Sequence, residues 1–221
     1  MLIPEGAVVA VGLASEAALL PAGTRVLVSG GDAARLAEML EALPADVTCV
    51  LSFGIAGGLA PEARTGEVLL AGTLHAGQTF APDATWTAAL AKGTGATGTG
   101  ARVVPLAASE TLLADVQAKR ALHAATGAHA VDMESGAVAR FATTRGLPFA
   151  VLRAVADGPE DALPRAAHRA LTPDGRPALG PVLAGLARRP WELPALIGLG
   201  RASARAHAAL AQAISSSAKG S

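Results

Sequence analysis

The amino-acid sequence has little of what several protein classes require. A single cysteine, Cys49, among 221 residues excludes an internal disulfide and any metal cluster built on cysteines. The 18 basic and 18 acidic residues cancel, so the chain lacks the basic face that nucleic-acid recognition requires. Charged residues are only 16% of the chain and hydrophobic residues 51%, a balance that excludes intrinsic disorder. Aromatic residues are 3%, so we expect a core built from many small side chains.

The sequence carries no targeting or membrane signal that we can identify. The apolar N-terminus lacks the basic first segment of a signal peptide and is interrupted by Glu5 and Glu16. No apolar run approaches the roughly 18 residues that would cross a bilayer, and we expect a soluble, cytoplasmic protein. The histidines are scattered without metal-ligand spacing, so we expect neither a metal nor a cofactor. They are His75, His123, His129, His168 and His207.

Short apolar runs alternate with longer amphipathic ones, a pattern typical of a sheet with helices on both faces. The length fits a single α/β domain, here residues 1–214, since such sheets often reach about 200–250 residues. Residues 92–102 are an expected mobile loop, 159–190 should contain short helical patches, and 215–221 should be a disordered tail. The expected strands are 7–13, 25–29, 47–53, 67–74, 102–107 and 149–156, and the expected helices are 33–43, 112–126, 134–145 and 193–214.

Acidic residues and glycines follow the expected strands at their carboxyl ends. Glu16 comes shortly after the first strand, Gly54-Ile55-Ala56-Gly57-Gly58 after the third, then Asp132-Met133-Glu134, and Asp157 after the last. Ligands of open α/β sheets collect at this edge, so we expect these carboxylates to converge there, without a His, Cys or Lys beside them. The glycine spacing fits neither a dinucleotide site nor a phosphate loop. Carboxylates without a metal suit the breaking of a glycosidic bond.

Three segments resemble the signature segments of the purine nucleoside phosphorylase and methylthioadenosine nucleosidase superfamily. They are residues 52–59 (SFGIAGGL), 131–139 (VDMESGAVA) and 152–157 (LRAVAD). They occur in the family's order, and the resemblance covers nearly the whole chain. It implies a three-layer αβα fold around a mixed, partly barrel-like sheet. It also implies an enzyme that transfers the glycosyl group of a purine nucleoside to phosphate or water, and a homo-oligomer of two or more subunits.

A later stretch is similar to one branch of that superfamily, the hopanoid-associated phosphorylases. The resemblance lies in residues 157–164 and 189–197. It implies release of adenine from adenosylhopane during hopanoid side-chain synthesis. The region 179–199 is then our candidate for a surface that contacts the hydrocarbon or a membrane, and Trp86 and Trp191 are candidates for interface or lipid-side residues. A plain C-terminal helix packed on the sheet is the competing interpretation of 179–199.

Asp157 stands where the superfamily keeps the aspartate that protonates the purine. To act as an acid near neutral pH it needs a raised pKa, which burial behind the apolar strand 149–156 would favour. Relatives often have a hydroxyl residue just before this aspartate, but here the residue is Ala156, so one hydrogen bond to the carboxylate is missing. The alternative is an aspartate that ends the strand and caps the next turn.

Glu134 begins a helix, where backbone N–H groups and the helix dipole keep a carboxylate charged. A charged Glu134 can accept hydrogen bonds from both ribose hydroxyls and offset positive charge on the sugar, and Met133 would pack under the sugar. The alternatives are a first-turn acid that only stabilises the helix and a methionine of the core. We interpret Asp132 as the helix N-cap.

The group that attacks the sugar is the least defined part of the predicted site. The resemblance places Glu16 where nucleosidases of the family use a glutamate to activate water, while a solvated glutamate on a helix is the alternative. Gly54, Gly57 and Gly58 would let the backbone approach the ligand and offer N–H groups to an anion or a water. Relatives often have Ser or Thr in place of Ile55.

A phosphate site is the other candidate for the acceptor. Gly30, Gly31 and Arg35 lie at the start of a helix, and helix N-termini bind anions. A tight turn and helix cap explain the same residues equally well. The sequence therefore leaves water and phosphate open as acceptors.

Two further functions remain open at this stage. One is a phosphorylase or nucleosidase of small soluble purine nucleosides such as methylthioadenosine. The other is a non-catalytic protein that binds a nucleoside or lipid on the same scaffold; Ile55 and Ala156 favour it, while Glu134 and Asp157 oppose it. The base-stacking residue is not identified, because leucines, Leu112 and Leu113, occupy the region where an aromatic often stands.

Overall fold

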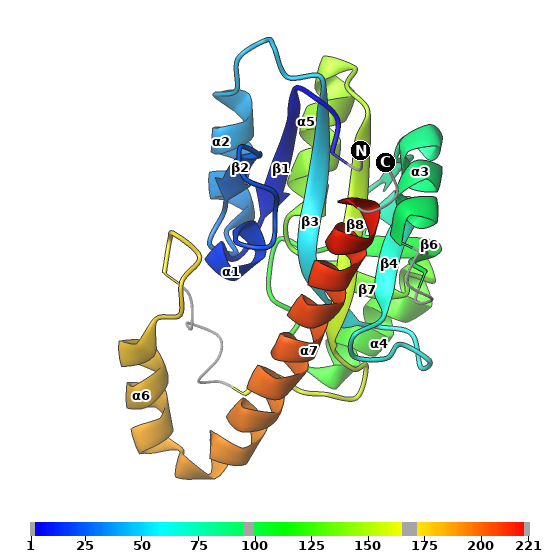
Figure 1. Ribbon diagram of the computed structural model, residues 1–221. Helices are drawn as coiled ribbons and strands as arrows, with labels where there is room; N and C mark the ends of the chain where they lie inside the picture. Colours follow the sequence, from blue (N-terminus) through cyan, green and yellow to red (C-terminus); the bar gives the residue numbers. More distant parts are fainter. Residues whose placement is uncertain (1–2, 95–99, 165–171, 219–221) are drawn as a thin grey trace.

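A mixed sheet forms the centre of the molecule, and helices cover both of its faces (Figure 1). The computed structural model describes residues 3–94, 100–164 and 172–218. Within them, the strand order is β2-β1-β3-β7-β6-β4-β5, and β8 pairs with both β3 and β4. Because β8 joins two strands that are distant in this order, the sheet closes into a partial barrel. The expected three-layer fold with a mixed, partly barrel-like sheet is confirmed.

The strands differ widely in length, from two to ten residues. They are β1 (Ala7–Val11), β2 (Arg25–Val28), β3 (Cys49–Gly58), β4 (Val68–His75), β5 (Thr79–Phe80), β6 (Arg102–Ala108), β7 (Ala130–Asp132) and β8 (Phe149–Asp157). The helices are α1 (Ala14–Ala17), α2 (Ala33–Glu41), α3 (Ala84–Thr94), α4 (Val116–Thr126), α5 (Ser135–Arg145), α6 (Leu179–Arg188) and α7 (Leu193–Ala218), with a 3₁₀ turn, η3 (Pro190–Glu192), before α7.

The central strands β1, β3 and β8 run parallel to one another. Every residue of β1 and β8 is buried, as expected for parallel strands that are covered on both faces. Their apolar sequences reflect this double burial. Because the three strands run in one direction, their carboxyl ends reach the same edge of the sheet, where Gly57 pairs in register with Asp157.

Helices α2 and α5 cover one face of the sheet, and α3 and α7 cover the other (Figure 1). On the second face, Ala206, Leu210 and Ala213 of α7 pack against the strands together with Trp86. Trp86 is thus a core residue and not the interface or lipid-side residue that we expected. Alanines are frequent in both core clusters, and their small size lets helices lie close to the sheet.

The boundaries of some elements differ from those expected. The segment Gly54–Gly58 continues strand β3, because Gly57 and Gly58 pair with β7 as well as with β8. Helix α3 was not predicted, and its last turn includes Lys92, which we had assigned to a loop. Helix α7 extends to Ala218, so residues 215–218 are helical where we expected a disordered tail. Residues 95–99 of the expected loop, and His168, lie outside the described residues.

Helix α6 and the first half of α7 project from the body of the molecule (Figure 1). We call residues 179–199 of this projection the arm. Its exposed large apolar side chains include Leu183, Trp191 and Ile197, which are 62%, 72% and 46% exposed. Among the described residues, no helix is both long and apolar enough to pass through a membrane.

Candidate active site

Four acidic residues predicted from the sequence are buried near the carboxyl ends of the central strands. Glu16, Asp132, Glu134 and Asp157 are between 2% and 8% exposed. The first three surround Arg153 of β8, whose Nη2 lies 2.9 Å from Asp132 Oδ1 and 3.6 Å from Glu134 Oε2. The structure thus brings the predicted carboxylates together, but around an arginine to which the sequence analysis had given no role.

Arg153 is fully buried, and the donors of its Nη2 are directed at this cluster. Its Nη2 also donates to Ser52 Oγ at 2.6 Å, whereas its Nε and Nη1 have no hydrogen-bond partner among the described residues. A Cβ on Gly54 would lie 2.7 Å from Nη1 and closer still to Glu16 Oε1. Gly54 is therefore required because a side chain there would occupy the space in which Glu16 and Arg153 approach each other.

Glu16 is held by backbone donors and is not a solvated helix residue. Its Oε2 accepts from the N–H groups of Gly12 and Leu13 at 2.9 and 2.8 Å. Its Oε1 accepts from the N–H of Ile55 at 2.8 Å. Burial raises the pKa of Glu16, while the positive charge of Arg153 and these hydrogen bonds act in the opposite direction. A carboxylate with a raised pKa is suited to take up a proton near neutral pH.

Glu134 stands at the start of α5, as predicted, but its environment does not favour charge. Burial raises its pKa to about 7; Arg153 opposes this shift, while the neighbouring charges of Asp132 and Glu16 add to it. We had expected the helix start to keep Glu134 ionised, and desolvation outweighs that effect. Its Oε1 accepts from Ser29 Oγ at 3.2 Å.

Asp132 caps the start of α5 through its side chain, but the N-cap residue itself is Glu134 and not, as we expected, Asp132. Its Oδ1 accepts from the backbone N–H groups of Glu134 and Ser135 at 2.8 and 2.7 Å, and its Oδ2 accepts from Ser135 Oγ at 2.6 Å. These bonds satisfy donors at the start of α5. Together with the ion pair to Arg153, they fix the backbone that carries Met133 and Glu134.

Asp157 ends β8 and lies next to a lysine. Burial raises its pKa, and the ammonium of Lys119, which forms an ion pair with its Oδ2, opposes the shift. A Cβ on Gly57 would approach Asp157 Oδ2 to 3.3 Å, so this glycine leaves room for the carboxylate. The expectation that no lysine accompanies the carboxylates was wrong, because α4 folds back over the end of β8.

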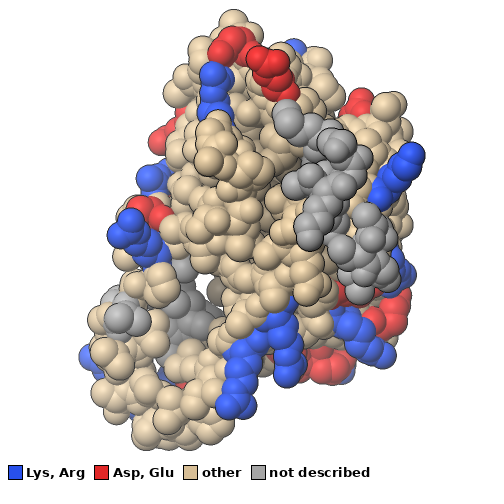
Figure 2. Space-filling view, in the orientation of Figure 1, with Lys and Arg blue, Asp and Glu red and all other residues tan. Residues whose placement is uncertain are grey.

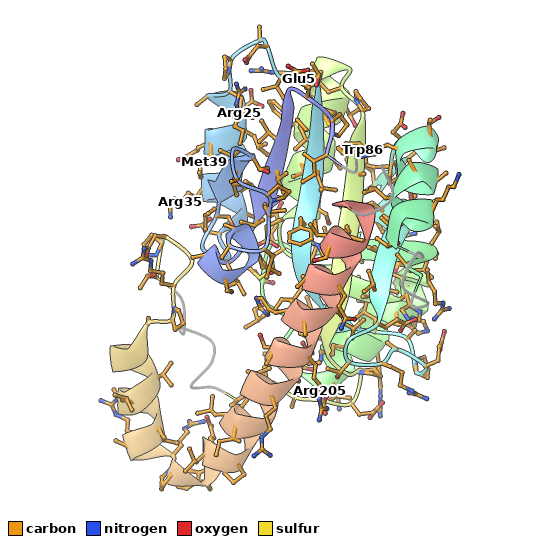
Figure 3. All side chains as sticks on the ribbon, in the orientation of Figure 1. Glu5, Arg25, Arg35, Met39, Trp86 and Arg205 are labelled. Atoms are coloured by element: carbon orange, nitrogen blue, oxygen red, sulfur yellow. The ribbon has the colours of Figure 1, made fainter. Side chains whose placement is uncertain are left out.

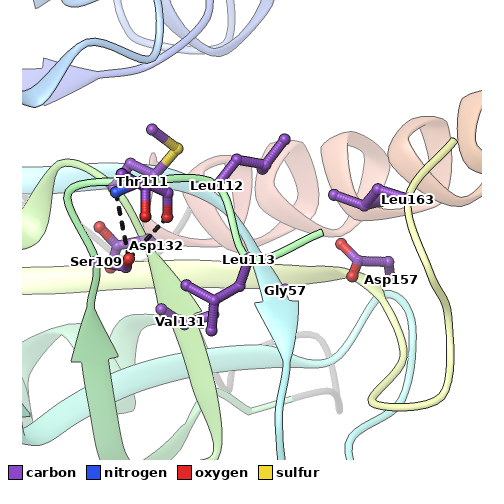
Figure 4. Close-up of a pocket in the computed structure, with 10 residues that line it drawn as sticks. Gly57, Ser109, Thr111, Leu112, Leu113, Val131, Asp132, Asp157 and Leu163 are labelled. Carbon is purple, nitrogen blue, oxygen red and sulfur yellow. Dashed lines mark hydrogen bonds between the residues drawn. The ribbon is translucent and has the colours of Figure 1, made fainter. Parts of the chain in front are cut away.

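A pocket connects Asp157 with the segment that precedes Glu134 (Figure 4). Asp132 lies at one end of it and Asp157 at the other, and leucines form much of the wall between them. Glu134 itself is not among the lining residues. The lining residues are Gly57, Ser109, Thr111, Leu112, Leu113, Val131, Asp132, Met133, Asp157 and Leu163.

The backbone donors of the candidate phosphate site are engaged within the protein. Gly30 N–H donates to Gly12 O at 3.0 Å, and Gly31 N–H donates to Ser29 Oγ at 3.1 Å. Asp32 Oδ1 accepts from the first free N–H groups of α2, including that of Arg35. The side chain of Arg35 is half-buried (labelled in Figure 3), and its Nη1 is buried without a hydrogen-bond partner among the described residues. This geometry favours a tight turn with a capped helix.

Three residues of this region escaped the sequence analysis. Arg153 had a usable signal, because a lone arginine inside an otherwise apolar strand is seldom buried without partners. Lys119 had none: it sits on an amphipathic helix beside Arg120, and the sequence does not show which of the two is buried. Ser29 simply follows an apolar strand, so nothing distinguished it.

The structure is thus a partly closed mixed sheet with carboxylates and an arginine buried near the carboxyl ends of its central strands. The sequence matches the family model of the phosphorylase superfamily over residues 17–179. The chain belongs to this superfamily and is an enzyme of the nucleoside phosphorylase and nucleosidase type. No curated protein matches the sequence.

Solved structures of nucleosidases share the fold. The 5'-methylthioadenosine/S-adenosylhomocysteine nucleosidase of Neisseria meningitidis, in complex with methylthio-immucillin-A, is 17% identical with a TM-score of 0.72, covering 96% of this chain and 98% of its own. The S-adenosylhomocysteine nucleosidase of Streptococcus pyogenes, in complex with 5-methylthiotubericidin, is 17% identical with a TM-score of 0.67, covering 94% and 95%. The futalosine hydrolase of Helicobacter pylori is 15% identical with a TM-score of 0.64, covering 95% and 97%.

Proposed function

We propose that this enzyme releases adenine from adenosylhopane and that water is the acceptor. The observation that carries the proposal of glycosidic cleavage is the arrangement of Glu16, Glu134 and Arg153 beside a pocket that ends at Asp157. The choice of adenosylhopane rests on the resemblance of residues 157–164 and 189–197 to the hopanoid-associated branch.

Asp157 supplies the proton that the departing purine requires. Adenine is a poor leaving group as an anion, and a proton placed on N7 lets it depart as a neutral base when the bond between C1' and N9 breaks. The raised pKa of Asp157 supports this role, because the carboxyl must be neutral before it can donate. The leucines of the pocket wall, Leu112, Leu113 and Leu163, would enclose the base.

Glu134 binds the ribose and Glu16 activates the water. Both carboxyls share the single positive charge of Arg153 with Asp132, so the cluster carries excess negative charge when all three are ionised. That excess is suited to the cation-like sugar formed as the purine leaves. The water oxygen then bonds to C1', and its proton passes to Glu16. Met133 packs under the sugar.

Water is favoured over phosphate for two reasons. The N–H groups of Gly30 and Gly31 are already used, so they cannot cradle a dianion. Ile55 has no side-chain hydroxyl to contact phosphate, and its backbone N–H donates to Glu16 instead. The site is therefore arranged around a carboxylate, whose negative charge would repel phosphate.

The arm is the candidate surface for the hydrocarbon part of the substrate or for the membrane that holds it. Its apolar side chains Leu183, Trp191 and Ile197 are exposed, and arginines lie along the same elements at 188, 189, 201 and 205. Figure 2 shows basic side chains over the part of α7 where the arm meets the body. Apolar residues flanked by arginines suit the boundary of an anionic bilayer.

The test is adenine release across a panel of substrates, with and without phosphate. Adenosylhopane or another 5'-alkyl adenosine in vesicles should release adenine without phosphate, and faster than methylthioadenosine. A requirement for phosphate would make the enzyme a phosphorylase. Faster cleavage of methylthioadenosine would favour the second candidate, a nucleosidase of small soluble substrates, which the nucleosidase relatives suggest. Tight nucleoside binding without any turnover would favour a binding protein.

We also propose a homo-oligomer of at least two subunits, following the resemblance to the superfamily. Light scattering of the purified protein measures its mass, and a monomer at assay concentration that is fully active would contradict this proposal.

A further inference from the structure

Lys119 is the buried group next to the candidate acid that the proposed function leaves without a role. Its side chain is 1% exposed and forms an ion pair with Asp157 Oδ2. The same Nζ donates to the backbone oxygens of Gly158 and Asp161 at 2.8 and 2.9 Å. An ammonium has three N–H donors, and each of them therefore has one acceptor.

The local fold explains how a lysine reaches this position. Helix α4 begins after Asp115, whose side chain accepts from the N–H of Ala118, and Lys119 follows one turn later on the inner face. The next residue, Arg120, is directed outward and pairs with Glu160 at the surface. Burial of an ammonium is costly unless it is paired and hydrogen-bonded, so the position of Lys119 demands the three contacts that it makes.

We propose that Lys119 and Asp157 share one proton, and that Lys119 is a positioning residue that supplies Asp157 with the proton it gives to the purine. This inference rests on the proposed function. When one proton moves from Nζ to Asp157, the neutral amine still donates its two remaining N–H groups to Gly158 O and Asp161 O. Its lone pair accepts from the new carboxyl O–H. The proton thus moves without the loss of any other hydrogen bond.

The reaction then balances within the pair. As the bond between C1' and N9 breaks, adenine keeps the bonding electrons and takes the proton from Asp157 on N7. The pair is left as a neutral amine and a carboxylate, and a proton from solvent restores the ammonium after the products leave.

Lys119 also takes the place of a missing partner. The residue before Asp157 is Ala156, which has no hydroxyl to hold the carboxylate. The Nζ of Lys119 supplies a donor to the same carboxylate from a different element, α4, which is bound to the end of β8 by the contacts with Gly158 and Asp161.

In the part of the chain that the structure describes, few other charged side chains lie near the pair, and most of them are paired elsewhere. Arg120 pairs with Glu160, and Asp132 pairs with Arg153. Asp161 is the charge that adds to the raised pKa of Asp157, while Lys119 opposes it. Strand β3 faces the pair with Gly57. Among the described residues, the charged groups around the pair are Asp115 just before α4, Arg120 on α4, Asp132 on β7, and Glu160 and Asp161 after β8.

The pH profile of kcat for adenine release separates a shared proton from a structural contact. An ammonium gives up its proton at higher pH than a carboxyl does. Without the ammonium, Asp157 has no reserve of protons at high pH. We therefore expect the basic limb of the K119M profile to lie at least about one pH unit below that of wild type. Arginine keeps its charge but does not release a proton, so K119R should also fall about 10-fold or more in kcat near neutral pH. Its KM should stay close to that of wild type. R120M, on the exposed neighbour, is the matched control and should resemble wild type.

Protein that contains a lysine analogue keeps the shape and charge of the Lys119 side chain. The chain has three lysines, Lys92, Lys119 and Lys219, and biosynthetic replacement of lysine by 4-thialysine makes all three amines stronger acids. We expect the basic limb of the profile to move to lower pH, and a K119R protein with the same replacement to show no such shift. This variant decides the question if K119M or K119R fails to fold in thermal unfolding measurements.

Two results would overturn the inference. One is a K119R protein whose pH profile of kcat equals that of wild type, which would show that only the charge and packing of residue 119 matter. The other is a basic limb unmoved by thialysine. If wild type releases no adenine, the proposed function fails, and the shared proton is then tested on the protein without substrate. With thialysine in place of lysine, the ¹³C signal of the Asp157 carboxyl should move toward that of a neutral acid. An unchanged signal would overturn the inference.

Discussion

Glu16 Oε1 accepts a hydrogen bond at 2.8 Å from the backbone N–H of Ile55, 39 residues further along the chain. The bond joins the turn after β1 to the glycine-rich end of β3. It fixes the carboxylate that, in the proposed function, activates the attacking water, and its donor is the main chain of a residue that has no side-chain hydroxyl.

Replacing Asp157 by Asn removes the proton donor but keeps the size of the side chain. We expect kcat to fall by about 10²–10⁴-fold, the usual contribution of a general acid, with a much smaller change in KM. Steady-state rates of adenine release measure both constants. E160Q, three residues further on and exposed, is the control and should behave as wild type. Equal losses in kcat and in binding would contradict the role of Asp157 as an acid.

Glu134 should make the stability of the protein depend on pH. Its pKa is raised from 4.5 to about 7, so between these values the folded protein binds more protons than the unfolded chain. The free energy of unfolding should therefore fall as pH rises from about 4.5 to 7. In E134Q this fall should be smaller by about 1–3 kcal/mol, since one pKa unit corresponds to about 1.4 kcal/mol.

Urea unfolding at pH 5 and pH 8 measures this effect. E110Q, at an exposed glutamate that pairs with Arg140, is the control and should keep the wild-type dependence on pH. If E134Q and wild type lose the same free energy between the two pH values, Glu134 does not hold a proton in the folded protein.

A methyl group at position 54 should damage the site without removing any functional group. In G54A the new Cβ would meet Arg153 Nη1 at 2.7 Å and would also displace Glu16. Because three backbone donors hold Glu16, the carboxylate cannot move freely, and we expect kcat to fall by about 10-fold or more. G200A in α7 is the control, since no atom lies within 4 Å of its new Cβ. Wild-type activity in G54A would show that the contact between Glu16 and Arg153 is dispensable.

Substitutions in the arm should change the rate of adenine release only for lipid-linked substrates. A double variant, L183S with W191S, removes two exposed apolar side chains, and we expect it to lower adenine release from adenosylhopane in vesicles. Release from a small soluble nucleoside should not change, because the pocket lies elsewhere. V103S is the matched control, since Val103 is 51% exposed on β6. An equal loss on both substrates would mean that the arm supports the fold rather than the substrate.

A comparison of single elements shows which parts of the fold the sequence predicts. The apolar run that became β8 and its terminal Asp157 were read correctly, because a strand covered on both faces needs an almost uninterrupted apolar sequence. Helix α3 was missed, since threonines and a glycine weaken its pattern and tertiary packing of Trp86 and Leu90 holds it in place. Predicted helix 112–126 begins only at Val116, where Asp115 supplies the cap.

The sequence by itself determined the class of fold, the carboxylates at the ends of the strands and membership of the superfamily, because these depend on local apolar patterns and on short motifs. Only the tertiary structure decided the charge state of the site and its partners. Burial raises the pKa of Glu134 to about 7, Arg153 stands between three carboxylates, and Lys119 reaches Asp157, which lies 38 residues further along the chain. Desolvation and Coulomb interactions depend on distances through space, and no local pattern in the chain records those distances.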